Sequence, residues 1–76
     1  MNYVDIRVPQ LAKTFDCKLE EHVKISVLIS QLTVLLLGRR AEGILFSLNQ
    51  KRVLQKEQTL LEQGVVSGQT LLLIFI

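Results

Sequence analysis

The sequence Thr70-Leu71-Leu72-Leu73-Ile74-Phe75-Ile76 is apolar at every position after Thr70. A short, unbroken apolar run of this kind is typical of a strand that is buried on both faces of a sheet. The residues just before it, Ser67-Gly68-Gln69, are small or polar, as turn residues are. We therefore expect residues 70–76 to form the central strand of a sheet, with the other elements arranged around it.

Two alternating segments at the start of the chain predict a β-hairpin. Within Tyr3–Val8, and again within Lys13–Leu19, apolar and polar residues alternate, which is typical of strands with one buried face. Pro9 ends the first strand because proline cannot donate a hydrogen bond to the ladder. Gln10–Ala12 then supply a short loop between the two strands.

The middle of the chain has helical rather than alternating periodicity. One stripe of the expected helix is apolar and consists of Ile25, Leu28, Ile29, Leu32, Leu35 and Leu36. We expect the helix to run from about Ser26 to Leu37, with Ser26 as its N-cap and Gly38 as its C-terminal stop. Arg39 and Arg40 follow beside the negative end of the helix dipole.

The remaining segments complete an α+β fold. Ile44–Leu48 predicts a third strand, and after a turn Arg52–Leu54 predicts a short fourth strand. Thr59–Gln63 could make one helical turn, followed by Gly64 in a left-handed conformation. This order predicts a β-grasp, in which a helix packs across a mixed sheet of about five strands and the first and last strands pair in parallel.

Composition restricts the class of protein. Of the 76 residues, 49% are hydrophobic and 21% are charged, and this composition is too apolar for a disordered chain. The length is sufficient for one small domain, residues 1–76. A net charge of +2 is too small to predict binding to nucleic acid or to an anionic membrane. The single cysteine excludes an internal disulfide and fits a reducing compartment.

No targeting or membrane-spanning segment is visible in the sequence. The N-terminus has no basic region followed by an apolar core, so no signal peptide is predicted. The longest apolar runs, residues 34–37 and 71–76, fall far below the roughly 18 residues that a spanning helix needs. We expect a cytoplasmic protein without direct membrane insertion, and the Met start with a compact pattern up to the last residue favours a complete small protein.

The order of elements resembles ubiquitin, and a local match is carried by Thr59-Leu60-Leu61-Glu62-Gln63-Gly64-Val65-Val66-Ser67-Gly68-Gln69-Thr70-Leu71. The ubiquitin-like pattern has a leucine, an acidic residue, an aliphatic residue after a left-handed turn, and a polar loop leading into a Leu-x-Leu strand. With Gly64, Val65 and Gly68, this version is more similar to the small bacterial YukD/EsaB ubiquitin-like proteins. Those proteins accompany the type VII secretion system of Gram-positive bacteria, so the resemblance implies an accessory or regulatory role there.

One departure from ubiquitin concerns covalent attachment. Ubiquitin, its conjugating relatives and the sulfur carriers of this fold end in a flexible tail that closes with Gly-Gly. The present sequence ends at Phe75-Ile76 and contains no Gly-Gly, and the YukD-like proteins lack that tail as well. A covalent modifier or sulfur carrier is therefore a disfavoured alternative, which a precursor extension containing Gly-Gly would support.

Side chains that could support catalysis are few. Cys17 is expected to pack in the core as a small hydrophobic residue, although a Cys17–His22 pair stays conceivable. His22 has no further ligand at metal-binding spacing, so Glu20-Glu21-His22 predicts a solvated turn. Neither a phosphate-binding glycine loop nor a nucleophile elbow is present. We expect no enzyme activity, no metal and no cofactor.

Apolar residues exceed what one face of the expected helix can bury. Val27 and Val34 fall opposite the apolar stripe, and no charged residue lies between Val27 and Leu37. A surface helix of a soluble monomer normally has a charged back. We therefore predict that Val27 and Val34 belong to an interaction surface.

The last strand gives a second candidate surface. If Leu71 and Leu73 point to the core, Leu72 and Ile74 point to the open face of the sheet. The resemblance places Leu72 and Ile74 at positions that match the apolar binding patch of ubiquitin. Exposed apolar clusters usually mark interaction sites, so we predict that Leu72 and Ile74 contact a partner.

The basic pairs Arg39-Arg40 and Lys51-Arg52 fall on predicted loops. Nucleic-acid binding would need a larger basic patch with interleaved aromatic residues, so we expect no nucleic-acid partner. We predict instead that Arg39 and Arg40 form the basic rim of a protein-binding surface.

These observations lead to a hypothesis about function. A non-catalytic protein would dock an apolar patch, rimmed by basic residues, onto another protein such as a secretion-system component. The alternative is a ubiquitin-like domain that belongs to, or docks onto, a larger membrane-bound secretion component. The surface used, and whether the chain also forms a homo-oligomer, stay open.

Overall fold

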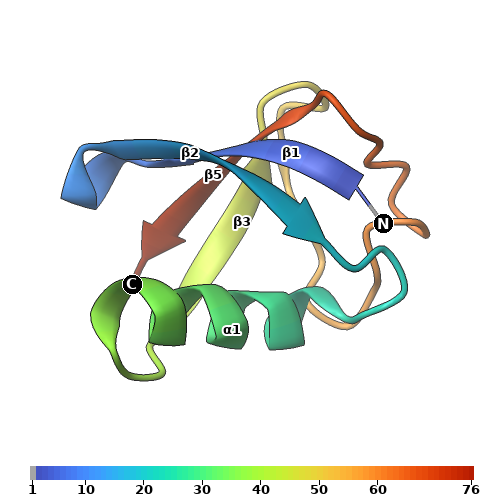
Figure 1. Cartoon of the computed structure of the whole chain (residues 1–76). Coiled ribbons are helices and arrows are strands. Elements are labelled where there is room, and N and C mark those ends of the chain that lie inside the picture. Colours follow the sequence, from blue (N-terminus) through green and yellow to red (C-terminus); the bar gives the residue numbers. More distant parts are fainter. Residues whose placement is uncertain (1) are drawn as a thin grey trace.

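The structure describes residues 2–76, in which five strands form one mixed sheet and one α-helix crosses a face of that sheet (Figure 1). The computed structural model contains, in chain order, β1 (Asn2–Val8), the 3₁₀ turn η1 (Pro9–Leu11), β2 (Lys13–Leu19), α1 (Ile25–Leu37), β3 (Gly43–Ser47), β4 (Arg52–Val53) and β5 (Thr70–Phe75). Every predicted strand is present. Leu48, Leu54 and Ile76, which we expected at strand ends, lie one residue outside their strands.

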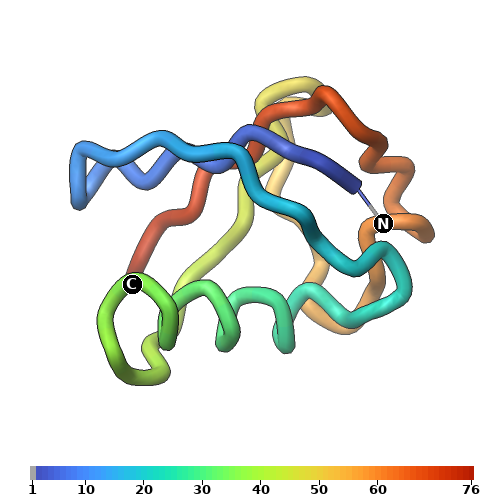
Figure 2. The backbone as a smooth tube through the Cα atoms, viewed as in Figure 1, coloured from blue at the N-terminus to red at the C-terminus, as the bar shows by residue number. Residues whose placement is uncertain are grey.

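β5 lies in the middle of the sheet, whose strand order is β2-β1-β5-β3-β4. It runs parallel to β1, where Ile6 faces Leu71, and antiparallel to β3, where Leu45 faces Leu73. Figure 2 shows the last segment of the chain passing back between the first and the third strands. The arrangement confirms the predicted α+β β-grasp, including the parallel pairing of the first and last strands.

The core lies between the sheet and α1, as strand alternation predicts. The completely or almost completely buried apolar side chains are Val4, Ile6, Val8, Leu19, Ile25, Leu28, Ile29, Leu32, Leu45, Leu54, Leu60, Val65, Leu71 and Leu73. Two members of the predicted helix stripe are missing from this set: Leu36 is only partly buried against the core, and Leu35 is 73% exposed. Leu35 lies two turns after the almost completely buried Leu28, at nearly the same angle around the helix axis. Its position along α1, and not its angle around the axis, therefore accounts for its exposure.

The start of α1 differs from the prediction. Lys24 occupies the N-cap position and makes no side-chain cap, so Ser26 is not the N-cap. The first backbone N–H groups of the helix are bound by a distant loop: Ile25 N–H donates to Gln58 O at 2.9 Å and Ser26 N–H donates to Lys56 O at 3.0 Å. These groups have no partner within their own helix, and here the carbonyls of residues 56 and 58 replace a capping side chain.

The end of α1 agrees with the prediction. Gly38 has φ +74° and donates its N–H to Val34 O at 2.9 Å, which closes the last turn. The Thr33 hydroxyl donates to Ser30 O at 3.0 Å and accepts the N–H of Ala41 at 3.2 Å, so it ties the following loop to the helix. No helix in the described part of the chain is long and apolar enough to cross a membrane.

Residues 59–63 form a single turn with helical hydrogen bonds, as expected, because Gln63 N–H donates to Thr59 O at 3.3 Å. Thr59 N–H donates to Glu62 Oε1 at 3.0 Å, and Glu62 N–H donates to Thr59 Oγ1 at 3.1 Å. This reciprocal pair is a capping box, and it is followed by a single helical turn instead of a longer helix. Gly64 follows with φ +73°, as predicted, and turns the chain away before further helical hydrogen bonds can form.

Candidate protein-binding surfaces

The face of the sheet that is turned away from α1 carries Leu72 and Ile74. Leu71 and Leu73 are completely buried in the core, whereas Leu72 and Ile74 are half-buried on the open face. Alternation along β5 therefore places both residues on the side that the sequence predicts.

Cross-strand neighbours extend these two residues into a patch. In the β3–β5 pairing, Ile44 faces Ile74 and Phe46 faces Leu72. Phe46 also faces Val53 of β4, whose side chain is 47% exposed. Side chains of directly opposite residues on one face of an antiparallel pair touch, so Ile44, Phe46, Val53, Leu72 and Ile74 form a continuous apolar surface, which we call the open-face patch.

The rest of the open face carries charged side chains together with Tyr3 and Thr14. Arg7 of β1 faces Leu72 in the parallel pairing and lies with its Nε 3.4 Å from Asp5 Oδ2. Farther from the patch, Lys18 Nζ lies 5.4 Å from the centre of the Tyr3 ring. The patch thus has Arg7 at its border, and this arginine was not among the predicted basic residues.

Three residues of the open-face patch were missed by sequence reasoning: Ile44, Phe46 and Val53. The alternation in Ile44–Leu48 was recognised, but it does not say which side of the strand is buried. Pairing with β5 settles this, because Leu45 is completely buried opposite Leu73, and Ile44 and Phe46 are then outside. Side-chain polarity would also have misled, because it predicts that Phe46 is buried and that Ser47 is exposed. Instead, Ser47 is buried and Phe46 is half-exposed.

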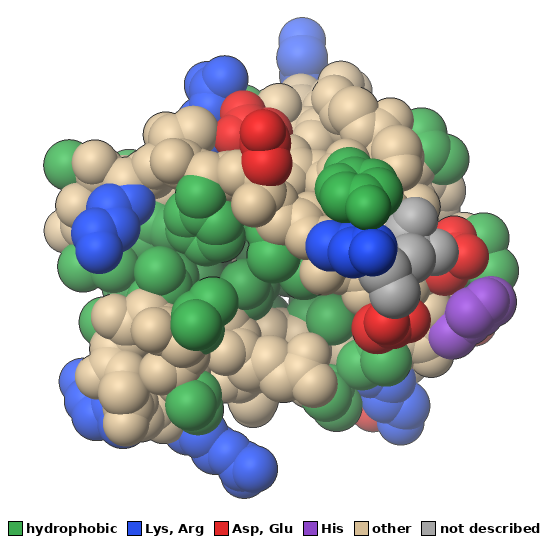
Figure 3. Space-filling model, viewed as in Figure 1, with side chains coloured by type: hydrophobic (Ala, Val, Ile, Leu, Met, Phe, Trp, Pro, Cys, Tyr) green, Lys and Arg blue, Asp and Glu red, His purple; other side chains and the backbone are tan. Residues whose placement is uncertain are grey.

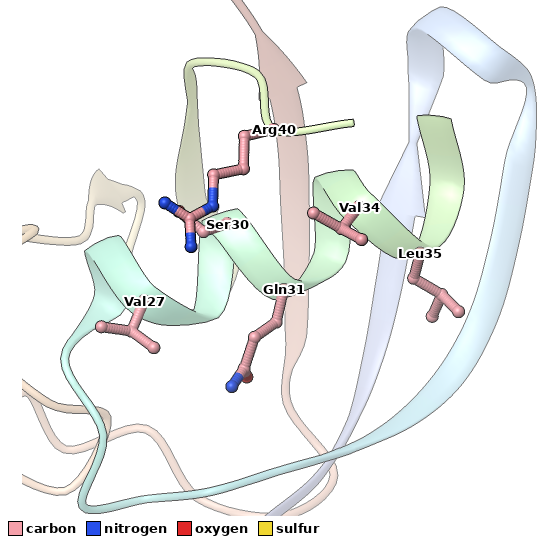
Figure 4. A pocket seen from close by; sticks show the side chains of 6 residues that line it. All are labelled: Val27, Ser30, Gln31, Val34, Leu35 and Arg40. Carbon is pink, nitrogen blue, oxygen red and sulfur yellow. The ribbon is translucent and has the colours of Figure 1, made fainter. Parts of the chain in front are cut away.

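The back of α1 carries the second predicted surface. Val27 is 43% exposed and Val34 is 46% exposed. Together with Ser30, Gln31, Leu35 and Arg40 they line a shallow hollow, and Figure 4 shows the Arg40 side chain folded back along the helix toward Ser30. Leu35, which we expected in the core, thus belongs to this surface.

Arg39 and Arg40 have different positions. Both are exposed after the end of α1, but only Arg40 lines the hollow with Val27 and Val34. Since α1 lies on one side of the sheet and the open-face patch on the other (Figure 1), the predicted residues form two separate surfaces rather than one patch with a basic rim.

Comparisons with known proteins agree on the fold. No protein-family model and no curated protein matches the chain, but solved structures do. The EccD5 ubiquitin-like domain from Mycobacterium xenopi has a TM-score of 0.75 and 25% identity, over 99% of this chain and 93% of that chain. The fold is the ubiquitin-like β-grasp.

Two structures with lower sequence identity support the same fold. The N-terminal ubiquitin-like domain in the 4931431F19Rik protein has a TM-score of 0.79 at 17% identity, over 99% of this chain and 74% of that chain. A de novo designed protein based on ubiquitin has a TM-score of 0.75 at 20% identity, over 97% of this chain and 87% of that chain.

Reactive side chains of this ubiquitin-like domain are dispersed. Within residues 2–76, no three His, Cys, Asp or Glu side chains gather as metal ligands. His22 Nε2 lies 3.8 Å from Glu21 Oε1 in an exposed turn. Cys17 packs against the core, as expected, but its side chain is only half-buried, and this burial raises the pKa of its thiol.

Labelling of Cys17 should be slow in the native ubiquitin-like domain and fast in denaturant. The thiolate is the reactive form, and a raised pKa leaves little of it at neutral pH. The rate should therefore climb as pH rises toward the raised pKa. Absorbance after mixing with a disulfide reagent measures both rates, and equally fast labelling of native and denatured protein at pH 7 would revive the reactive-thiol interpretation.

Proposed function

We propose that this chain is a non-catalytic, cytoplasmic ubiquitin-like domain that binds another protein through the open-face patch. Its role would be that of an accessory or regulatory component in a bacterial type VII secretion system. The observation that supports binding is the patch itself, because five apolar residues from three adjacent strands are left uncovered on one face. Contiguous exposed apolar surfaces of this kind mark interaction sites more often than isolated apolar residues do.

The chemistry of the patch indicates the kind of partner. Phe46 and the aliphatic residues around it suit an apolar anchor, and Arg7 at the border suits a carboxylate on the partner's rim. Binding would be equilibrium docking without a covalent step. The secretion role rests on two similarities, to the EccD5 ubiquitin-like domain over nearly the full length of both chains and to the YukD/EsaB pattern at residues 59–71.

A second candidate keeps the fold and changes the context. The chain could be a ubiquitin-like domain that belongs to, or docks onto, a larger membrane-bound secretion component. This second candidate is favoured by the similarity to EccD5, because the similar structure is a ubiquitin-like domain of that protein. Sequencing of the surrounding gene would separate the two, since an open reading frame that continues into membrane-spanning segments supports the second.

The binding proposal predicts a loss of partners in Leu72→Glu. An apolar anchor at the centre of an interface can contribute about 2 kcal/mol, so affinity should fall about 30-fold. The measurement is affinity purification of tagged protein from its own host, with quantitative mass spectrometry of the secretion-system components that co-purify.

The matched control is Leu61→Glu. Leu61 is also an exposed leucine, at 53%, but it lies in the turn at residues 59–63 and outside both candidate surfaces. Leu61→Glu should keep the partners that Leu72→Glu loses. Retention of every partner by Leu72→Glu would exclude the open-face patch and leave the hollow around Val27 and Val34 as the binding surface.

A further inference from the structure

β2 is an edge strand with an open side. It stands at one end of the sheet with β1 as its only neighbour among the described strands. Its seven residues pair with β1 in continuous register from Lys13 to Leu19, without a bulge. The strand at the other edge, β4, has only two residues. Edge strands are usually protected by shortness, proline or a bulge, and β2 has none of these, so its protection rests on its charges.

The hydrogen bonds of β1 show which way its backbone groups point. Asp5 donates its N–H to Gln69 O at 3.0 Å, and Tyr3 O accepts the N–H of Gly68 at 2.9 Å. Both partners lie just before β5, on the side away from β2. Because the direction alternates along a strand, the even-numbered residues of β1 form the hydrogen-bonded pairs with β2.

The same alternation identifies the free groups of β2. Val4 and Ile6 of β1 face Cys17 and Phe15, so odd-numbered residues of β2 use their N–H and C=O groups toward β1. The even-numbered residues, Thr14, Asp16 and Lys18, then direct theirs to the open edge.

Asp16 is in an unfavourable position within one copy of the chain. Its directly opposite residue on β1 is Asp5, and like charges at such positions destabilise a sheet. Asp5 has Arg7 3.4 Å away, whereas the ion pairs found among residues 2–76 do not include Asp16. A cation that arrives from the open edge would compensate this charge.

We propose that β2 pairs antiparallel with β2 of a second copy, about a two-fold axis beside Cys17, so that the chain forms a dimer with a continuous sheet. In this register Asp16 of each copy faces Lys18 of the other. Both residues point their backbone groups to the open edge, so each such pair exchanges two hydrogen bonds. An axis beside Asp16 or beside Lys18 would instead place like charges face to face, so the charges select the register.

The same register covers apolar surface on the helix side of the sheet. Phe15 would lie opposite Leu19 of the second copy, and Cys17 opposite Cys17. In one copy Phe15 and Cys17 are only partly buried against the core, and Figure 3 shows hydrophobic side chains gathered on the visible face between the hairpin and α1. A second copy would therefore remove apolar area from water as well as extend the sheet.

Charge reversal tests the proposal by sedimentation equilibrium. The wild type should show a concentration-dependent mass that approaches that of a dimer. Asp16→Lys and Lys18→Asp should each raise the dimer dissociation constant about tenfold, because two attractive pairs become repulsive. The combined variant Asp16→Lys/Lys18→Asp should restore dimerisation to within about threefold, since each pair is attractive again. Circular dichroism of every variant checks that the monomer is folded.

Oxidation tests the register. Non-hydrogen-bonded antiparallel pairs have Cα atoms about 4.5 Å apart, within the 4.4–6.8 Å that a disulfide needs. Oxidised glutathione should therefore convert the two Cys17 thiols into an intermolecular disulfide. It takes up their two electrons and two protons and is itself reduced to two glutathione molecules. The control is Thr14→Cys in a Cys17→Ala background, because Thr14 is more exposed but its two copies would lie roughly 20 Å apart. It should give no linked dimer.

The remaining outcomes oppose the proposal. A wild type that stays monomeric up to millimolar concentration overturns the proposal. A dimer whose dissociation constant is unchanged by either single charge reversal overturns it as well. Dissociation by Leu72→Glu alone would mean that two copies meet through the open-face patch. A monomeric wild type that loses another protein in Asp16→Lys would mean that β2 pairs with a foreign strand. The Leu72→Glu outcome would also bear on the proposed function, because a second copy would then occupy the open-face patch. The other outcomes leave the proposed function unchanged, because that function is tested at Leu72 and not on β2.

Discussion

Leu73→Glu is expected to unfold the protein at 25 °C, whereas Leu72→Glu is expected to leave it folded. Leu73 is completely buried in the central strand, opposite Leu45, which is buried as completely. A carboxylate there would lose its hydration without gaining a partner, at a cost of several kcal/mol. Small domains have only about 5–15 kcal/mol of total stability, and this chain lies at the small end.

Leu72 provides the matched control one residue away. Its side chain lies half-exposed on the open face, so glutamate at this position keeps contact with water. The lost apolar packing against Phe46 should cost about 1 kcal/mol and lower Tm by about 4–8 °C. Far-UV circular dichroism and a thermal melt of both variants measure the contrast. A cooperative Leu73→Glu melt close to that of the wild type would mean that Leu73 does not lie in the core.

The elements that local patterns specify were predicted from the sequence. Strand alternation, the proline after β1 and the glycine after α1 each act within a few residues. The start of α1 could not be predicted in this way, because the carbonyls that bind its first N–H groups belong to Lys56 and Gln58, some thirty residues later in the sequence. Ser26 was a reasonable N-cap by local rules, and a tertiary contact made it unnecessary.

The residues of the candidate site were likewise predictable only where a local pattern determines them. Leu72 and Ile74 follow from alternation within one strand, since the buried residues of β5 determine where its neighbours point. Ile44 and Phe46 needed the register between β3 and β5, which links residues far apart in the chain. Leu35 lay at the edge of the apolar stripe, where the extent of the sheet and not the helical period decides burial. The role of these residues in binding stays a prediction.

Gln63→Leu should destabilise the protein by about 2–3 kcal/mol, because three hydrogen bonds of a nearly buried amide disappear. Gln63 is 5% exposed. Its Oε1 accepts the N–H of Gln55 at 2.7 Å, and its Nε2 donates to Gln55 O at 3.1 Å and to Thr59 O at 3.3 Å. Leucine has a similar volume, so the change removes the hydrogen bonds with little loss of packing. Tm should fall by about 10–20 °C.

The effect of Gln63→Leu should reach the helix through the loop that Gln63 holds. That loop presents the carbonyls of Lys56 and Gln58 to the first N–H groups of α1, so amide hydrogen exchange at Ile25 and Ser26 should accelerate more than exchange in β5. The control is Gln55→Leu, because the exposed Gln55 offers Gln63 only its backbone and should melt within a few degrees of wild type. Unchanged exchange at Ile25 and Ser26 in Gln63→Leu would show instead that the buried Leu54 and Leu60 hold the loop, and that the amide of Gln63 contributes little to the start of α1.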